Sequence, residues 1–342
     1  MVIICTRIID LRRIPLAKKE IKGSVTARKA GYIEKGGIKA LPHNIATDFK
    51  RNKTIYFLCI PIVLWYVIFC YLPMGGLVMA FQRYNVAKGI TGSQFVGFDN
   101  FIRFFTGPYF GRVMRNTTAI GLLDLVLGFP APIIFALLLN EVRNKSFKKV
   151  VQTTSYMPYF ISMVVIAGLI KDFTQSGGVI SNIVASITNS SAVNLLGEAK
   201  YFWWIYVLSG VWQGFGYGSI IYMAALSSID EQLYEAAVMD GANRWKQTLH
   251  ITLPGLAPTI TILLIMRMGS LFAVGSDKIL LLYSPAIYET ADVINTYVYR
   301  AGLVDMDYGF SAAVGLFNSV IGTVFLLVTN GICRKYSDTS LF

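Results

Sequence analysis

Long apolar segments separated by shorter polar ones dominate the pattern along the chain. A helix that crosses the hydrocarbon core of a bilayer needs about 20 mainly apolar residues, because its backbone polar groups must be satisfied internally. Six segments meet this requirement: 55–81, 117–140, 150–170, 201–226, 256–275 and 309–333. The pattern therefore predicts an all-α membrane protein with six transmembrane helices in one domain over 54–342, preceded by a basic arm at 1–53.

The positive charges give the expected orientation of these helices. Short cytoplasmic loops of membrane proteins carry an excess of Lys and Arg. With the N-terminus inside, 21 of the 31 Lys and Arg residues fall on the cytoplasmic side, in 1–53, 141–149, 227–255 and 334–342. Both termini are therefore expected in the cytoplasm, and the basic arm is expected to fix this topology.

The composition excludes several other classes of protein. Of the 342 residues, 54% are hydrophobic and 15% are charged, which is typical of a membrane protein. The net charge of +12 lies beside the apolar segments, so it indicates topology rather than nucleic-acid binding. The four cysteines form no C-x-x-C pair and the two histidines are far apart, so neither a metal site nor a catalytic cluster is expected. We predict that the chain is not an enzyme.

The segment 227–255, between the fourth and fifth predicted spans, has the pattern of two short helices joined at an elbow. Ser228 and Glu231 are expected to form a capping box at the start of the first helix. Gly241 can adopt the left-handed conformation that ends it, and Asn243 can cap the second helix. Pro254 is expected to limit the second helix before the fifth span.

The same segment resembles the EAA loop of ABC importer permeases. The resemblance rests on eight residues: Glu235, Ala236, Ala237, Asp240, Gly241, Ala242, Ile251 and Pro254. In that family the loop forms a coupling helix that sits in a groove of the ATP-hydrolysing subunit and moves with it. The resemblance implies that ATP and magnesium bind to partner ATPase subunits, and it implies no cofactor in this chain, which also lacks a G-x-x-x-x-G-K-[ST] loop.

Residues 53–342 also resemble the first permease of maltose-type carbohydrate-uptake systems, in the branch that imports oligosaccharides from complex polysaccharides. The stretches that carry this likeness are 96–101, 156–159, 281–285, 288–294 and 296–300. The chain departs from the branch at 275–278, where it reads Gly-Ser-Asp-Lys instead of Gly-Phe-Glu, and this puts the substrate in doubt.

This resemblance carries a full set of expectations. The fold should be that of a type I ABC importer permease in a bacterial plasma membrane. The partners should be a second homologous permease, two ATPase subunits, an extracytoplasmic solute-binding protein and membrane lipid, and the solute an oligosaccharide. Two alternatives stay open: an importer permease for an amino acid, peptide or anion, and an enzyme or assembly factor that retains the fold.

The solute pathway is expected among the last three spans. A sugar needs hydrogen-bonding groups beside aromatic faces, and the candidates are Trp212, Gln213, Arg267, Asn318 and Ser319. An arginine inside a span costs about 2.5–3.5 kcal/mol on insertion scales, so Arg267 should face a wet cavity, a carboxylate or the second permease. The glycines at 210, 214, 216 and 218 are expected to permit close helix contacts.

Overall fold

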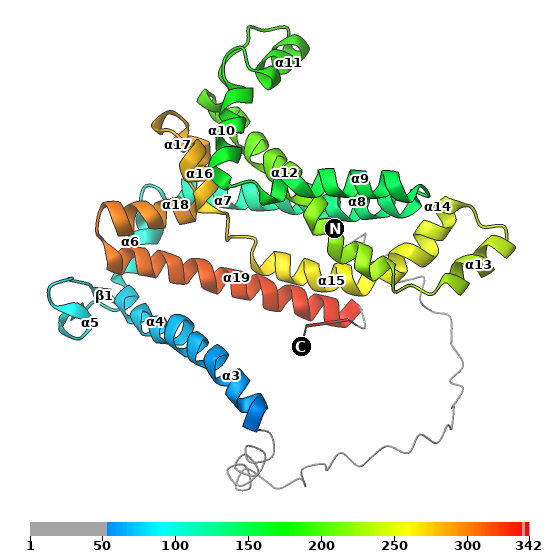
Figure 1. Ribbon diagram of the computed structural model, residues 1–342. Coiled ribbons are helices and arrows are strands. Elements are labelled where there is room, and N and C mark those ends of the chain that lie inside the picture. The colour runs from blue at the N-terminus through cyan, green and yellow to red at the C-terminus, as the bar shows by residue number, and fades with distance from the viewer. Residues whose placement is uncertain (1–52, 337–338, 342) are drawn as a thin grey trace. The chain divides into compact units, whose positions relative to one another are not determined.

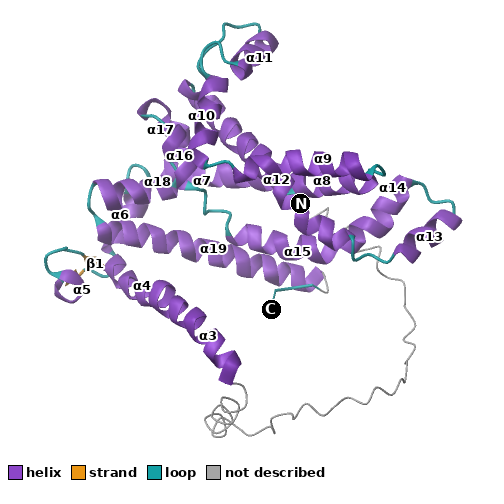
Figure 2. Ribbon diagram, in the orientation of Figure 1, coloured by secondary structure: helices purple, strands orange, loops and turns teal. Residues whose placement is uncertain are grey.

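The computed structural model describes residues 53–336 and 339–341, and Figure 2 shows that nearly all of them are helical. These residues belong to two compact units, one over 53–78 and the other from Met79 onward. The predicted basic arm lies outside the described residues except for Lys53. The boundary predicted between arm and permease domain therefore stays a prediction.

The first unit is most of a continuous helical segment, Lys53–Phe81. It consists of α3 (Lys53–Tyr66), the π-helical η3 (Val67–Tyr71), α4 (Leu72–Met74) and the 3-10 helix η4 (Gly75–Phe81). No side chain of α3, η3 or α4 is buried within the chain, although the segment is strongly apolar. Such a helix requires lipid or other helices around it.

A small hairpin and a short helix follow at the start of the second unit. Strands β1 (Gln82–Arg83) and β2 (Gln94–Phe95) pair antiparallel, with Gln82 opposite Phe95, and α5 (Gly89–Gly92) lies between them. The short helix is α6 (Asp99–Thr106). The Asn100 side-chain amide donates to the carbonyls of Ala80 and Gln82 at 2.9 and 3.0 Å and fastens the helix to the hairpin.

The second and third predicted spans differ in outcome. The second is the segment Phe110–Glu141, made of α7 (Phe110–Leu123), η5 (Asp124–Gly128) and α8 (Pro130–Glu141), so it starts earlier than predicted. The third prediction, one helix over 150–170, is wrong. The chain breaks between η6 (Met157–Phe160) and α10 (Met163–Thr174), where Ser162 is extended and its hydroxyl caps α10 by accepting from the Val165 amide.

The remaining elements complete the second unit. They are α9 (Lys145–Tyr156), α11 (Val179–Thr188), η7 (Leu195–Gly197), η8 (Ala199–Tyr201), α12 (Phe202–Leu226), α13 (Glu231–Met239), α14 (Arg244–Gln247), η9 (Thr248–Thr252), α15 (Leu253–Gly269), α16 (Ser276–Leu282), η10 (Pro285–Ile287), α17 (Tyr288–Ala291), α18 (Ile294–Tyr299), η11 (Arg300–Val304) and α19 (Tyr308–Tyr336). The fifth span ends at Gly269 rather than 275. It also begins earlier than predicted, because α14, η9 and α15 form the continuous segment Arg244–Gly269.

Within the described residues, five helical segments are long and apolar enough to cross a membrane: Lys53–Phe81, Phe110–Glu141, Met163–Thr188, Arg244–Gly269 and Tyr308–Lys335. Helix α12 is not among them, although its 25 residues would extend about 38 Å at 1.5 Å per residue. Its glycines and polar side chains lower its hydropathy. The six-span count and the orientation of the termini therefore stay predictions.

Close helix packing holds the second unit together. Helix α12 lies along α8 and α9, and α15 lies along α19 (Figure 1). A side chain at Gly216 of α12 would overlap the Ser155 carbonyl of α9, which confirms the role predicted for this glycine. Gly218 and Gly210 also face neighbours, at 3.2 and 3.5 Å from an added Cβ, whereas Gly214 has nothing within 4 Å, so that prediction is wrong.

Candidate functional site

The elbow between α13 and α14 lies at one end of the second unit, opposite α6, α17 and α18 (Figure 1). The cap of α13 differs from the predicted capping box. The Asp230 carboxylate accepts from the Gln232 amide at 2.9 Å, whereas the Ser228 hydroxyl donates to the Ala225 carbonyl at 2.7 Å. An acceptor at this position satisfies one of the unpaired amides of the first helical turn.

The turn itself agrees with the predicted geometry. Gly241 has φ of 75°, in the left-handed region, and the Ala242 amide bonds back to the Ala237 carbonyl at 2.8 Å. Asn243 caps α14 by accepting from the Lys246 amide at 2.9 Å. Pro254 does not limit this helix, because it stands in the first turn of α15, which continues the same helical segment. The second arm of the elbow is thus continuous with the helix of the fifth predicted span.

The elbow presents both polar and apolar side chains to its surroundings. Of the eight predicted coupling residues, Glu235, Ala236, Asp240 and Gly241 are exposed, and Ala237, Ala242, Ile251 and Pro254 are half-buried. Large apolar side chains lie beside them, with Met239 86% and Trp245 69% exposed. Exposed apolar groups gathered in one place are typical of a protein interaction surface.

Three contacts tie the elbow to the spans. The Tyr234 and Thr252 hydroxyls lie 3.0 Å apart and join α13 to the segment that leads into α15. The side-chain amide of Gln247 donates to the Ala242 carbonyl at 2.8 Å. Ile229, at the end of α12, packs against the apolar cluster that contains Leu256 of α15. These contacts link α13 to α15 and to the segment that follows α12.

Two of the predicted pathway residues line one cavity. Asn318 and Ser319 of α19 face a cavity of about 300 Å³ with Ser270, at the end of α15. The Asn318 amide donates to the Asn295 side-chain oxygen at 3.2 Å, and Asn295 in turn donates to the Val274 carbonyl at 2.7 Å. The buried Asn318 Oδ1 has no hydrogen-bond partner among the described residues. The Ser270 and Ser319 hydroxyls donate to the Arg267 and Gly315 carbonyls, so the cavity offers hydroxyl oxygens as acceptors.

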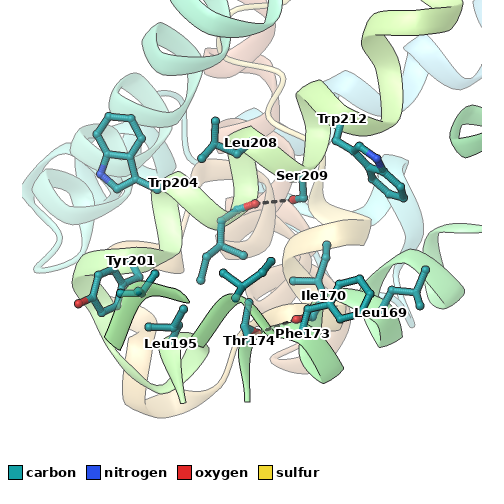
Figure 3. A pocket seen from close by; sticks show the side chains of 13 residues that line it. Leu169, Ile170, Phe173, Thr174, Leu195, Tyr201, Trp204, Leu208, Ser209 and Trp212 are labelled. Carbon is teal, nitrogen blue, oxygen red and sulfur yellow. Dashed lines mark hydrogen bonds between the residues drawn. The ribbon is translucent and has the colours of Figure 1, made fainter. Parts of the chain in front are cut away.

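Trp212 lies elsewhere. It lines an apolar cavity of about 470 Å³ between α10, α11 and α12, together with Trp204 and Phe173 (Figure 3). The Thr174 hydroxyl beside this cavity already donates its hydrogen to the Ile170 carbonyl, at 2.6 Å. Gln213 is half-buried on α12 and lines neither this cavity nor the one beside Asn318.

Arg267 forms an ion pair with Asp124 of η5, the carboxylate partner that was one of the expected environments. Lys278 of α16 is a third charged residue near this ion pair, and the sequence did not predict it there. Its ammonium donates to the Tyr206 carbonyl at 2.8 Å. Burial lowers the pKa of Lys278 to about 8, while the nearby Asp124 charge opposes this shift. The only sequence signal for Lys278 was its place in the departure at 275–278.

Residues 128–337, which include the elbow and both cavities, match the family described as "Binding-protein-dependent transport system inner membrane component". The chain belongs to this family. The resemblance to ABC importer permeases and the predicted importer-permease fold are both confirmed. The family is one of transport components rather than enzymes. Its helices and family place the chain in a membrane as an integral protein.

Curated relatives agree with this assignment along most of the chain. The chain is 41% identical to Protein LplB of Bacillus subtilis over 294 residues, covering 86% of this chain and 92% of LplB. It is 39% identical to the polygalacturonan/rhamnogalacturonan transport system permease protein YteP of the same organism, covering 85% and 91%.

Solved structures extend the likeness to three dimensions. The chain is similar to a chain of the bacterial alginate ABC transporter in complex with an alginate pentasaccharide-bound periplasmic protein. Their TM-score is 0.79 and their identity 42%, over 86% of this chain and 99% of the other. A second structure, of a bacterial ABC transporter that imports the acidic polysaccharide alginate, gives a TM-score of 0.77 and 41% identity, over 85% and 99%.

Proposed function

We propose that this chain is the transmembrane permease subunit of an ATP-driven importer that translocates oligosaccharides delivered by an extracytoplasmic binding protein. The observation that carries the proposal is the exposed elbow at Gly241, in a chain that matches an importer-component family over residues 128–337. Its place is the bacterial plasma membrane, with several spans and both termini in the cytoplasm. A second homologous permease and two ATPase subunits complete the complex.

We infer further that the oligosaccharide is acidic. YteP is named for polygalacturonan and rhamnogalacturonan, and the solved relatives import alginate, an acidic polysaccharide. Arg267, one of the proposed pathway residues, adds a cation that is paired with Asp124 in the isolated chain. An importer for an amino acid, peptide or other anion is the outcome that would replace this inference.

The elbow couples ATP hydrolysis to the spans. Glu235 pairs with a basic group of the ATPase, and Ala236 and Ala237 permit close approach of the two backbones. Asp240, Gly241 and Ala242 form the bend, and Ile251 and Pro254 join it to the fifth span. When the ATPases close on ATP, α13 moves with them and the spans open outward to accept the solute. ATP and magnesium bind only to the ATPases, so we assign no cofactor to this chain.

For the pathway, we propose that Asn318 and Ser319 contact the sugar through the cavity at the end of α15. The Ser319 hydroxyl donates its hydrogen to the Gly315 carbonyl, so its oxygen is an acceptor for a sugar hydroxyl. Trp212 and Gln213 on α12 and Arg267 on α15 remain candidates that become part of the pathway once the second permease closes around them. Their side chains are exposed or half-buried in the isolated chain.

The function is tested by ATP turnover in the assembled complex. The chain is co-purified with its neighbouring permease, ATPase and binding protein in nanodiscs, and turnover is measured with trigalacturonate, a neutral xylotriose, a tripeptide and phosphate. We expect stimulation by trigalacturonate with the binding protein. Stimulation by xylotriose alone would retain the importer and remove the acidic substrate, and stimulation only by the peptide or phosphate would overturn the sugar assignment.

The coupling role is tested at the elbow. Glu235→Ala removes the charge that faces the ATPase, and Gly241→Pro cannot adopt a φ of 75°. We expect both variants to insert normally but to lose ATPase recruitment and uptake. Gln232→Ala, at an exposed position of the same helix, is the matched control and should behave as wild type. Normal uptake by both elbow variants would contradict the role.

A further inference from the structure

A second polar cavity, of about 360 Å³, is lined by residues of α6 and of the segment from α17 to η11. In Figure 1, α6, α17 and α18 lie at the end of the second unit opposite the elbow. The volume of the cavity is within the range of small-molecule binding sites. Three arginines and three tyrosines line it: Arg103, Arg112, Arg300, Tyr109, Tyr288 and Tyr297. They come from α6, the start of α7, and the segment from α17 to η11, so the fold gathers them from distant parts of the chain. Nothing in the coupling mechanism uses them.

Two of these arginines are held in place by one buried carboxylate. The fully buried Asp292 side chain accepts from Arg112 Nη2 at 2.7 Å and from Arg300 Nη2 at 2.8 Å, both on the same oxygen. Its other oxygen accepts from the Thr296 hydroxyl at 3.0 Å. The guanidinium groups are therefore fixed before any ligand arrives.

Around Asp292 this arrangement leaves one positive charge and several donors in surplus, while Asp305 and Asp307 also line the cavity. Two guanidinium groups share one carboxylate, and each carries five N–H donors. Among the described residues, the buried atoms Arg112 Nε and Arg300 Nη1 have no hydrogen-bond partner, and the two side chains keep 27% and 23% of their surface exposed. At the rim, Arg103 is already paired with Asp307, so the surplus belongs to Arg112 and Arg300. Unused donors of a fixed guanidinium pair match the two oxygens of a carboxylate.

The rest of the lining matches a sugar ring. The Arg112 guanidinium lies 4.7 Å from the centre of the Tyr109 ring, and that of Arg300 lies 5.2 Å from the Tyr288 ring. Tyr109 is 45% exposed, so its ring keeps a surface on which a pyranose can rest. Asp305 also lines the cavity. Its carboxylate repels a carboxylate that comes close to it, but it can accept hydrogen bonds from the hydroxyl groups of a sugar.

We propose that this cavity is an outer subsite for one uronate residue of the oligosaccharide. Arg112 and Arg300 bind the sugar carboxylate, Asp305 accepts from its hydroxyls and Tyr109 supports the ring. The inference rests on the proposed import of acidic oligosaccharides. The proposed subsite is separate from the cavity lined by Asn318 and Ser319. Its arginines would explain why this chain takes an acidic substrate.

The test measures binding of free trigalacturonate to the assembled transporter in nanodiscs without binding protein, by saturation-transfer NMR and calorimetry. The fully methyl-esterified trisaccharide, which is neutral, is the comparison ligand. We expect the ester to bind roughly tenfold more weakly, since it loses the charge-assisted pair. Tyr109→Ala and Arg112→Lys should each weaken trigalacturonate by a similar factor. Arg83→Gln removes an exposed charge outside the cavity and should change nothing.

Several results would overturn the proposal. Equal binding of the acid and its ester, or wild-type binding by both cavity variants, would remove the subsite. If Arg112→Lys impairs only the stimulation by the binding protein and not the binding of free trigalacturonate, the occupant is a carboxylate of that protein and the sugar assignment is wrong. In each case stimulation of the wild type by trigalacturonate would leave the proposed function intact, and its absence would overturn that function separately.

Discussion

Asp124 and Arg267 are the two charged residues predicted within spans, and each provides the environment that the other needs. A lone charge at membrane depth costs about 2.5–3.5 kcal/mol on insertion scales. The ion pair between η5 and α15 lowers this cost by giving each group an opposite charge and a hydrogen bond. Gly128 makes room for it, since a Cβ there would lie 2.6 Å from Asp124 Oδ1.

We expect Arg267→Gln to destabilise the chain by roughly 1–3 kcal/mol, because Asp124 then lacks its charged partner. The double variant Asp124→Asn with Arg267→Gln should recover part of this loss, since neither member of the pair is left without the other, while Lys278 loses the nearby carboxylate. Unfolding of the detergent-solubilised chain, followed by tryptophan fluorescence, measures both effects. Asp172→Asn, which removes an exposed carboxylate, is the control. A double variant as unstable as the sum of the singles would contradict the pairing.

At the scale of elements, a helix was predicted well where one apolar run forms one helix. This holds for Lys53–Phe81 and for α12, whose residues 202–226 match the predicted 201–226. It fails for the third span, because the apolar run continues across the backbone break before Ser162. It fails at the end of α15 as well, since Leu271 and Phe272 are apolar but fold into the core outside the helix. Hydropathy indicates that a side chain avoids water, but it does not show whether the backbone at that residue is helical.

The contact between α12 and α9 provides a prediction at this scale. Gly216→Ala should destabilise the chain by about 1–3 kcal/mol, because the added methyl group overlaps the Ser155 carbonyl and forces the helices apart. Gly214→Ala, two residues away with nothing within 4 Å, should be neutral or slightly stabilising. The unfolding temperature and the yield of the purified chain check both. Equal stability of the two variants would show that the helices do not meet at Gly216.

Over the whole molecule, the sequence predicts features that depend on neighbouring residues, but it does not predict contacts between residues that are far apart in the chain. The elbow was predictable because Gly241 and Asn243 act on their own neighbours. The outer cavity was not, because Arg112 and Arg300 are 188 positions apart and meet only through Asp292. Lys278 was missed for the same reason, since its partners lie on α12 and η5.

The predicted topology can be tested on either side of α12. Ser186 on α11 and Gln232 on α13 are both exposed, and α12 separates them. In a variant whose four cysteines are replaced by serine, Ser186→Cys should react with a membrane-impermeant maleimide added to intact cells. Gln232→Cys should react only after the membrane is opened, because the excess of Lys and Arg and the ATPase partner place α13 in the cytoplasm. Labelling of both positions from outside would mean that α12 does not span, and labelling of Gln232→Cys alone would invert the topology. Either result would remove α13 from the reach of the ATPases and with it the coupling proposed for the elbow.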